Sequence, residues 1–481
     1  MTARVLVLAA LVALLAGCGG SHRRASPPPK AHTRTVTPKP KPKPKHPLHT
    51  TGKLTKLVVT ILDGDRRVRV RGARVRLWQR SGRTNRHGVT TIEAPRGRHE
   101  VSVSAPGYTE ARVPVDFRHS RWQTVSIYQP GLQWPIYGAT TARTQAPQQI
   151  RLRPPFHVVW SRGLGHLIEF PAVVDNGFAY IGNARGTVHA ISMRSGKFAW
   201  VHRTSGAPKM ASSPAVDGDE IVYHTMDGWV YVLDRFNGRL RWRWHAGAAI
   251  ESSPIVVDGV DYFGDWNGEM YALDLRTHRL RWRRYLGAKI TSSAAIAGGR
   301  LFIGDYAGRL WALSPGSGST RWIGHVNGKI YGTPAVAGGR VFVPSVAYSL
   351  WAFSTSGRYL WRVPAGSYVY SSPAVADGVV CWGSYTGTFY GASAASGRIL
   401  WETNTGGAIS GAAVIVDGVA YAGSFSHRIV GVNLHTGRRL VTFPHGQYVP
   451  VSGNGMRLLF NGFSRIYAVE PRGSKRRQLA H

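Results

Sequence analysis

The chain has 481 residues, of which 43% are hydrophobic, and its 61 Lys and Arg against 24 Asp and Glu give a formal net charge of +37. This length and this hydrophobic content are sufficient for a large buried core. The two cysteines, Cys18 and Cys381, are too few for a disulfide framework or a cysteine-based metal site.

Residues 1–17 predict a secretion signal. Arg4 precedes an apolar run of 12 residues at 5–16, which is too short to span about 30 Å of hydrocarbon. The run ends in Leu15-Ala16-Gly17-Cys18, which looks like a bacterial lipobox. We therefore expect an extracytoplasmic protein, lipid-anchored to a bacterial membrane through Cys18. An ordinary signal peptide with a chance cysteine is the alternative.

Residues 18–50 are predicted to be a Pro/Lys-rich linker. They contain eight Lys or Arg and no acidic residue, including four consecutive Pro-Lys pairs at 38–45. Such a segment favours extended polyproline II, with a rise of about 3.1 Å per residue. It is interpreted as a solvated spacer or, alternatively, as a strap on anionic lipid or wall polymer, which would help the acyl anchor hold the membrane.

Residues 51–131 predict a small β-sandwich. Val75 and Leu77, and then Val101 and Val103, alternate with Arg or Ser, as expected of strands with one buried face. The patterns Gly-Ala-x-Val-x-Leu at 72–77 and Gly-x-x-x-Val-x-Val-x-Ala-x-Gly-Tyr at 97–108 resemble the carboxypeptidase regulatory-like (prealbumin-like) domain. That resemblance implies a spacer or adhesion module.

Residues 132–481 repeat a unit of about forty residues eight times. Each unit shows four short strand patterns and no helical period, which predicts an eight-bladed β-propeller. A tryptophan recurs at intervals of 40, 42, 40, 40, 39 and 40 residues, with Val441 in the eighth place, at Trp160, Trp200, Trp242, Trp282, Trp322, Trp361 and Trp401.

The last unit supplies three strands, so residues 156–161 are predicted to complete it and close the ring. First strands are expected to begin near Phe170, Ser213, Ser253, Ser293, Thr333, Ser372, Gly411 and Val449. Each indole is expected to pack against the next blade. Glycines in the turn before the fourth strand are expected to have positive φ, at Gly196, Gly238, Gly397 and Gly437. A second glycine set is expected to leave room for the indoles, at Gly182, Gly264, Gly304, Gly383 and Gly423.

The segments 190–200, 272–282 and 312–322 are similar to the tryptophan-docking motif of pyrroloquinoline quinone (PQQ)-like propeller repeats. This resemblance implies one of two functions. Quinoprotein dehydrogenases hold PQQ with Ca²⁺ bound by Glu, Asn and Asp, and many carry adjacent cysteines. The propeller lipoproteins of the outer-membrane β-barrel assembly machinery are non-catalytic scaffolds, and their architecture is the more similar. This chain has no adjacent cysteines and no long insertion between repeats.

The sequence predicts no enzyme, no catalytic residue, no metal and no cofactor, because no activated nucleophile, phosphate loop or metal cluster occurs. The recurring Ser-Ser-Pro segments are interpreted as packing turns. Asp265 and Asp305 occupy equivalent turns, where capping is the favoured role and ligand contact the alternative. Cys381 is interpreted as a buried, inert thiol.

Two loops of each blade, the one before the first strand and the one between the second and third strands, are expected on one face. They gather candidate binding residues at Lys209, Glu251, Asp265, Trp266, Lys289, Asp305, Tyr306, Lys329, Tyr331, Tyr368, Tyr370 and Tyr385. Aromatics mixed with lysines suit peptides or acidic glycans.

We therefore expect a non-enzymatic, extracytoplasmic scaffold lipoprotein that meets the membrane through its lipid and basic linker. An envelope protein or an anionic wall polymer is the expected partner. Nucleic acid is not expected, because secretion is predicted and the arginines are spread over many blades. A glycan-binding protein and a PQQ-dependent oxidoreductase are the alternatives.

Overall fold

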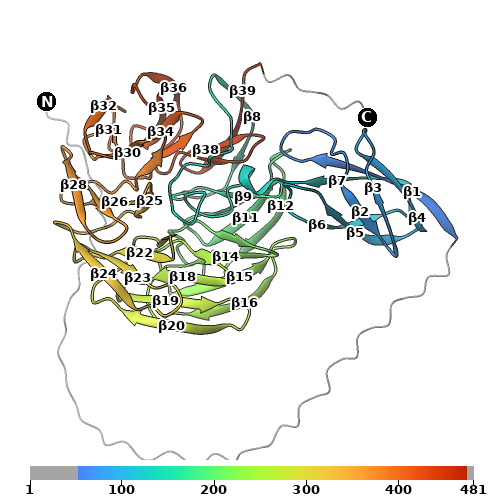
Figure 1. Cartoon of the computed structure of the whole chain (residues 1–481), viewed down its shortest axis with the longest axis horizontal. Helices are drawn as coiled ribbons and strands as arrows, with labels where there is room; N and C mark the ends of the chain where they lie inside the picture. The colour runs from blue at the N-terminus through green and yellow to red at the C-terminus, as the bar shows by residue number, and fades with distance from the viewer. Residues whose placement is uncertain (1–52, 474–481) are drawn as a thin grey trace, which may run out of the picture. The chain divides into compact units, whose positions relative to one another are not determined.

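The structure is a computed structural model that describes residues 53–473; the predicted signal peptide, Cys18 and the linker lie outside the described residues. The described residues form 39 strands in ten sheets and one short 3-10 helix, η1 (Pro130–Leu132), as Figure 1 shows. No helix in this part of the chain is long and apolar enough to cross a membrane. The predicted all-β fold is confirmed.

Residues 54–127 form two sheets around one core. The first sheet has the order β4-β1-β7, with β1 and β7 parallel, and the second has the order β3-β2-β5-β6. Val75, Val101 and Val103 are fully buried between them, which is the alternation that the sequence predicts. The strands are β1 (Leu54–Asp63), β2 (Arg74–Leu77), β3 (Arg80–Arg83), β4 (Val89–Pro95), β5 (Arg98–Ser104), β6 (Ala111–Asp116) and β7 (Trp122–Ile127).

Eight four-stranded antiparallel sheets, here called blades 1 to 8, follow between residues 156 and 471. Blade 1 contains β9 (Val173–Asp175), β10 (Phe178–Gly182), β11 (Thr187–Ser192) and β12 (Phe198–Arg203), and blade 2 contains β13 (Ala215–Asp217), β14 (Glu220–His224), β15 (Trp229–Asp234) and β16 (Leu240–His245). Blade 3 contains β17 (Ile255–Val257), β18 (Val260–Gly264), β19 (Glu269–Asp274) and β20 (Arg279–Tyr285), and blade 4 contains β21 (Ala295–Ala297), β22 (Arg300–Gly304), β23 (Arg309–Leu313) and β24 (Thr320–His325).

Blade 5 contains β25 (Ala335–Ala337), β26 (Arg340–Ser345), β27 (Ser349–Ser354) and β28 (Tyr359–Pro364), and blade 6 contains β29 (Ala374–Ala376), β30 (Val379–Gly383), β31 (Thr388–Ser393) and β32 (Ile399–Asn404). Blade 7 contains β33 (Val414–Val416), β34 (Val419–Ser424), β35 (Arg428–Asn433) and β36 (Arg439–Phe443), and blade 8 contains β37 (Val451–Gly453), β38 (Leu458–Asn461), β39 (Arg465–Pro471) and β8 (Phe156–Gly163). In blade 8, β39 pairs with β8, as predicted for residues 156–161.

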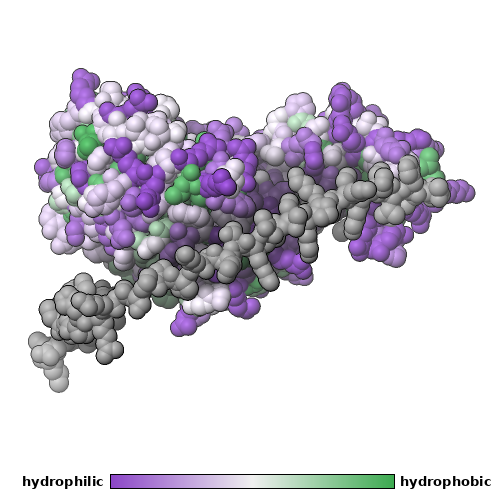
Figure 2. All heavy atoms as spheres, turned by 90° about the horizontal axis from the view of Figure 1, so that it is seen from below, coloured by the Kyte–Doolittle hydropathy of each residue, from purple (hydrophilic) through white to green (hydrophobic). Residues whose placement is uncertain are grey.

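The first strands of neighbouring blades contact one another, so they surround the central axis, and the fourth strands lie outermost. The second and third strands of each blade are almost wholly buried, whereas the outer strands expose most of their polar side chains. The face shown in Figure 2 is accordingly mostly hydrophilic, with scattered apolar side chains.

The first strands begin two to three residues later than predicted, for example at Val173 and Ile255. The residues before these strands form hydrogen bonds with the next blade and not with their own sheet. The Ser253 N–H donates to Ser293 Oγ (2.8 Å), and the Ser293 N–H donates to Thr333 Oγ1 (3.1 Å). The Ser-Ser-Pro segments are therefore packing turns, as predicted.

The seven predicted indoles lie against the next blade. Five of them donate Nε1–H to a backbone carbonyl there, as Trp401 does to Leu434 (2.7 Å); the others are Trp160, Trp200, Trp282 and Trp322. Trp361 packs on Gly397 without a hydrogen bond at Nε1, and Trp242 stacks on His278, 4.3 Å between ring centroids. The interface between blades 7 and 8 has no indole of this set, and there Phe443 packs on Tyr467 of blade 8, at 5.1 Å between ring centroids.

The predicted role of the second glycine set is wrong. A Cβ at Gly264 would meet Ile290 Cγ2 at 2.4 Å, so these glycines make room for the segment that leads into the first strand of the next blade. The indoles instead cover the turn glycines of the next blade: Trp200 lies on Gly238 and Trp401 on Gly437. These turn glycines have positive φ, as predicted.

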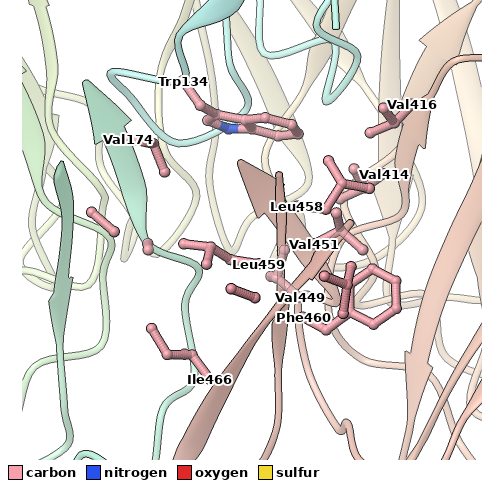
Figure 3. Close-up of a cluster of buried hydrophobic side chains, with 14 of the residues drawn as sticks. Trp134, Val174, Val414, Val416, Val449, Val451, Leu458, Leu459, Phe460 and Ile466 are labelled. Carbon is pink, nitrogen blue, oxygen red and sulfur yellow. The ribbon is translucent and has the colours of Figure 1, made fainter. Parts of the chain in front are cut away.

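Residues 134–145, here called the plug, cross the axis at one end of the propeller. The plug bonds to the inner strands of six blades, through the backbone pairs Trp134–Val174, Val216–Pro135, Ile296–Thr141, Val336–Ala142, Val375–Thr144 and Ile415–Gln145, each at 2.7–2.9 Å. Figure 3 shows the Trp134 indole above Val174 of β9 and beside Val416 of β33. The sequence pattern gives no sign of this segment, because it lies outside the repeat.

Arg143 fixes the plug from inside. Its guanidinium is fully buried and donates to the carbonyls of Tyr137, Ala294 (2.9 Å), Ser253 (3.2 Å) and Pro254 (3.0 Å). Burial lowers the pKa of Arg143 to about 10, so the group remains cationic at neutral pH. One cation therefore ties the plug to blades 3 and 4.

Candidate binding site at the propeller axis

Two loops of each blade meet at the end of the propeller opposite the plug. These are the lead-in loop before the first strand and the turn between the second and third strands. In seven blades the second residue of the turn donates its N–H to a lead-in carbonyl, at 2.8–3.0 Å: Ala184 to Leu167, Met226 to Lys209, Trp266 to Ala249, Tyr306 to Lys289, Val346 to Lys329, Tyr385 to Tyr368 and Phe425 to Ala408. The repeat thus brings these two loops together in seven of the eight blades.

A cavity of about 400 Å³, here called the cup, lies between these loops. Its lining is mainly aromatic and hydroxylated: Tyr137, Phe170, Tyr331, Tyr370, Tyr385, Phe425, Tyr448, Thr291, Ser293, Thr333, Ser372, Ser410, Gly332, Gly411, Ala412 and Val449, with Glu169, Lys209 and Glu251. Tyr137 belongs to the plug, and its hydroxyl lies 3.3 Å from Ser372 Oγ. The cup therefore has a floor, and the axis is not an open channel.

Glu251 is the centre of the polar wall. Its carboxylate accepts hydrogen bonds from the Tyr331 hydroxyl (2.6 Å) and from Trp266 Nε1 (3.1 Å). Burial raises the pKa of Glu251, and burial together with the charge of Glu251 raises the pKa of Tyr331. Tyr331 therefore remains a neutral hydrogen-bond donor, which holds the carboxylate in one orientation.

Lysines surround this wall. Lys209 Nζ lies 3.4 Å from the Glu169 carboxylate. Lys289 Nζ lies 3.1 Å from the centre of the Trp266 ring, a cation–π contact, and Lys329 Nζ lies 5.2 Å from the Tyr306 ring. Burial lowers the pKa of Lys289. This side of the opening combines fixed charges with flat aromatic surfaces.

The opposite side is a continuous aromatic wall without charge. Tyr370 contacts Tyr331 (5.2 Å between ring centroids) and Tyr385 (5.0 Å). Tyr385 contacts Phe425 (5.9 Å), which contacts Tyr448 (5.6 Å). Burial raises the pKa of Tyr370, Tyr385 and Tyr448, so the wall presents neutral rings and hydroxyls to a ligand.

The predicted candidates divide into three groups. Those lining the cup are Lys209, Glu251, Tyr331, Tyr370 and Tyr385. Those at its rim are Trp266, Lys289, Tyr306, Lys329 and Tyr368, and Trp266 and Tyr368 are 39% and 42% exposed.

Asp265 and Asp305 form the third group, because both are buried in their turns. Asp265 accepts from two turn N–H groups and the Tyr271 hydroxyl (2.9 Å), and Asp305 accepts from Trp311 Nε1 (2.9 Å). Capping, the favoured role, agrees with this geometry.

Five of the ten aromatic and charged lining residues were missed: Tyr137, Glu169, Phe170, Phe425 and Tyr448. Phe425 occupies the same turn position as Trp266, Tyr306 and Tyr385, so an alignment of all eight repeats would have found it. Tyr137 lies outside the repeat and leaves no periodic signal.

The cup does not fit the calcium site of a quinoprotein. Among residues 53–473, no group of three or more His, Cys, Asp and Glu side chains could hold a metal ion. Glu169 and Glu251, the two carboxylates of the cup, are engaged with Lys209, Tyr331 and Trp266. The thiol of Cys381 is buried, and burial raises its pKa.

The chain is similar to known proteins over the propeller. The sequence model of a family described as outer membrane protein assembly factor BamB matches residues 156–293 and 266–477. No curated protein matches. BamB from Moraxella catarrhalis is 18% identical, with a TM-score of 0.57 over 66% of this chain and 99% of that chain.

Quinohemoprotein alcohol dehydrogenase from Comamonas testosteroni is 13% identical, with a TM-score of 0.61 over 70% of this chain and 80% of that chain. A europium-containing methanol dehydrogenase is 12% identical, with a TM-score of 0.61 over 71% of this chain and 98% of that chain. At these identities the solved structures show the fold alone. The family match covers most of the chain, and the chain therefore belongs to the family of the outer membrane protein assembly factor BamB.

Proposed function

We propose that this chain is a non-enzymatic, extracytoplasmic lipoprotein whose propeller binds a segment of an envelope protein in the cup. The observation that carries the proposal is the cup itself: a floored cavity of about 400 Å³ with an aromatic wall on one side and fixed charges on the other. Binding sites of this kind are concave and mainly apolar, with a few placed polar groups. The family description as an assembly factor supports a scaffold role.

Lipid anchoring through Cys18 is part of the proposal. It rests on the predicted lipobox and on the family description, which names an assembly factor of outer membrane proteins. Metabolic labelling with a fatty acid tests it: wild-type chain should be labelled, and a Cys18→Ser chain should not.

Site-specific photocrosslinking tests the binding site. A photoreactive amino acid at Tyr385, which lines the cup, should capture a defined envelope protein in cells, and the same amino acid at Tyr359 should not. Tyr359 is 53% exposed and lies on outer strand β28, so it is a matched surface control. The captured protein is then purified, and its affinity should fall in a Tyr370→Ala chain. Equal capture at both positions, or an unchanged affinity, contradicts the proposal.

A glycan-binding function is the second candidate, favoured by the hydroxyl-rich lining and the exposed tyrosines. Aromatic faces and hydroxyls suit sugar rings, and Lys209, Lys289 and Lys329 suit acidic substituents. Sedimentation with purified cell-wall polymer separates the candidates, because glycan binding through the cup should require Tyr370 and weaken with salt. Dye-linked oxidation after incubation with PQQ and Ca²⁺ tests the oxidoreductase alternative; turnover above that of protein without PQQ would overturn the non-enzymatic proposal.

A further inference from the structure

The outer strands of blades 2 and 3 carry an unusual concentration of arginine. β16 and β20 together contain six arginines and no acidic residue: Arg241, Arg243, Arg279, Arg281, Arg283 and Arg284. The outer strands of blades 5, 6 and 7 (β28, β32 and β36) contain two arginines, Arg362 and Arg439, and one acid, Glu402. Arginines occur on many blades, but those of the outer strands are concentrated on blades 2 and 3.

Only part of this charge is neutralised. Arg241 pairs with Asp234 (2.7 Å), and Arg281 pairs with Asp274 (2.8 Å). Within residues 53–473, Arg279, Arg283 and Arg284 have no carboxylate within 4.0 Å, and all three are exposed. Three guanidinium groups on one strand are thus available to an anionic partner.

Apolar and aromatic side chains lie among these arginines. Tyr285 is 65% exposed, and Leu240 and Leu280 are 45% and 37% exposed. Trp242 of β16 stacks on His278, the residue directly before β20, at 4.3 Å between ring centroids, so the two outer strands are neighbours on the surface. Figure 1 shows β16 and β20 at the rim of the propeller.

Protection of the strand edge is the simpler explanation of charged outer strands, since charge discourages pairing with other chains. That explanation applies equally to all eight blades. It does not account for six arginines on β16 and β20 when β32 has none. An unbalanced distribution of this kind indicates a partner for one side of the ring.

We infer that β16 and β20 form a docking surface for an anionic lipid membrane. Each arginine near an anionic bilayer strengthens binding to that bilayer by about fivefold where salt screens the charges little. Tyrosine is favoured at the membrane–water interface, and short aliphatic side chains gain from burial there. The mixture of Arg279, Arg283 and Arg284 with Tyr285 and Leu280 fits a lipid headgroup region better than it fits a soluble polyanion. Because the outer strands are the furthest from the axis in each blade, this contact leaves the cup accessible and does not depend on its function.

The test uses the full chain with Cys18→Ser, so that no acyl anchor forms. An environment-sensitive fluorophore is attached at Tyr285→Cys or, as the control, at Tyr359→Cys on β28; Cys381 is fully buried and stays unlabelled. Vesicles of phosphatidylcholine with phosphatidylglycerol should shift the emission of the label at position 285 to the blue and leave the label at 359 unchanged. Vesicles of phosphatidylcholine alone should shift neither.

Charge-matched variants complete the test. Changing Arg279, Arg283 and Arg284 together to Gln should weaken the response at position 285 by at least about tenfold. Changing Arg358, Arg398 and Arg438 to Gln removes the same charge from exposed turns of blades 5 to 7 and should leave the response intact. Thermal unfolding confirms that both triple variants are folded. Equal losses in both triple variants, no shift at position 285, or an equal shift with soluble polyphosphate without lipid would overturn the inference.

Discussion

The packing of indoles on turn glycines predicts a strong difference between two glycines that share one backbone conformation. Gly437 has a φ of 68° and Gly378 a φ of 76°. A Cβ at Gly437 would lie 2.7 Å from Trp401 Cβ and Cγ, whereas a Cβ at Gly378 would have no neighbour within 4 Å. Alanine at either position costs about 1–2 kcal/mol for the left-handed conformation. At Gly437 the collision with Trp401 adds about 1–3 kcal/mol.

The free energy of unfolding should therefore fall by about 2–5 kcal/mol in Gly437→Ala and by about 1–2 kcal/mol in Gly378→Ala. Thermal and urea unfolding of the two variants beside the wild-type chain give this comparison. Equal destabilisation by the two substitutions would refute the argument, because only the contact with the indole distinguishes the two sites.

A double substitution separates the collision from the backbone cost. Trp401 is 6% exposed, and Trp401→Ala alone should cost about 3–5 kcal/mol. In the double variant the contacts with Cγ and Cδ2 of the indole are gone and only the contact with Cβ at position 401 remains, so the cost of Gly437→Ala should fall toward that of Gly378→Ala. The effects should thus be less than additive by about 1–3 kcal/mol; strict additivity is inconsistent with the contact.

Three further predictions follow from buried polar groups. Burial lowers the pKa of His189 from 6.5 to about 4, so the unfolded chain binds the proton more tightly and stability should fall by up to about 3 kcal/mol as pH decreases from 6.5 to 4; this pH dependence should flatten in His189→Phe when unfolding is measured across that range. Arg143→Met leaves four buried carbonyls without their donor and should destabilise the fold by about 3–5 kcal/mol, which calorimetry would contradict if the transition did not move. Tyr331→Phe removes the 2.6 Å hydrogen bond to Glu251 and should cost about 1–3 kcal/mol, with a smaller loss when it is introduced into a Glu251→Gln chain.

The propeller was predictable because its signals are periodic. A glycine that needs positive φ and an indole that follows it at a fixed distance recur in nearly every blade. The strand and turn assignment of one repeat is therefore supported by the same pattern in the others. The contact between blades was only half predictable. Trp401 and Gly437 are 36 residues apart, and periodicity alone does not tell whether an indole covers Gly437 of the next blade or Gly423. That depends on the stagger of neighbouring sheets.

The cup was predictable to the extent that its residues occupy repeat positions. Lys209, Glu251, Tyr331 and Tyr385 were identified because the two loops are fixed by the repeat. Tyr137 was missed because the plug binds through backbone groups, and almost any side chains are compatible with such bonding. The arginines of β20 are visible in the sequence, but their concentration has meaning only once β20 is known to be an outer strand.

The plug also limits what the cup can bind. A ring with an open axis can accommodate a polymer that passes through it, whereas a cavity with Tyr137 in its floor admits only the end or the tip of a chain. About 400 Å³ holds a few side chains or one or two sugar rings, so the rim must supply the remaining contacts.

Substitutions in the cup, such as Tyr370→Ala, should then accelerate dissociation, because they remove short-range contacts. Substitutions of the rim lysines, such as Lys329→Gln, should mainly slow association and reduce its salt dependence, because exposed charges act over long range. Stopped-flow kinetics with the identified partner should therefore separate the two groups of residues, and a partner whose association and dissociation respond alike to both substitutions does not bind in this way.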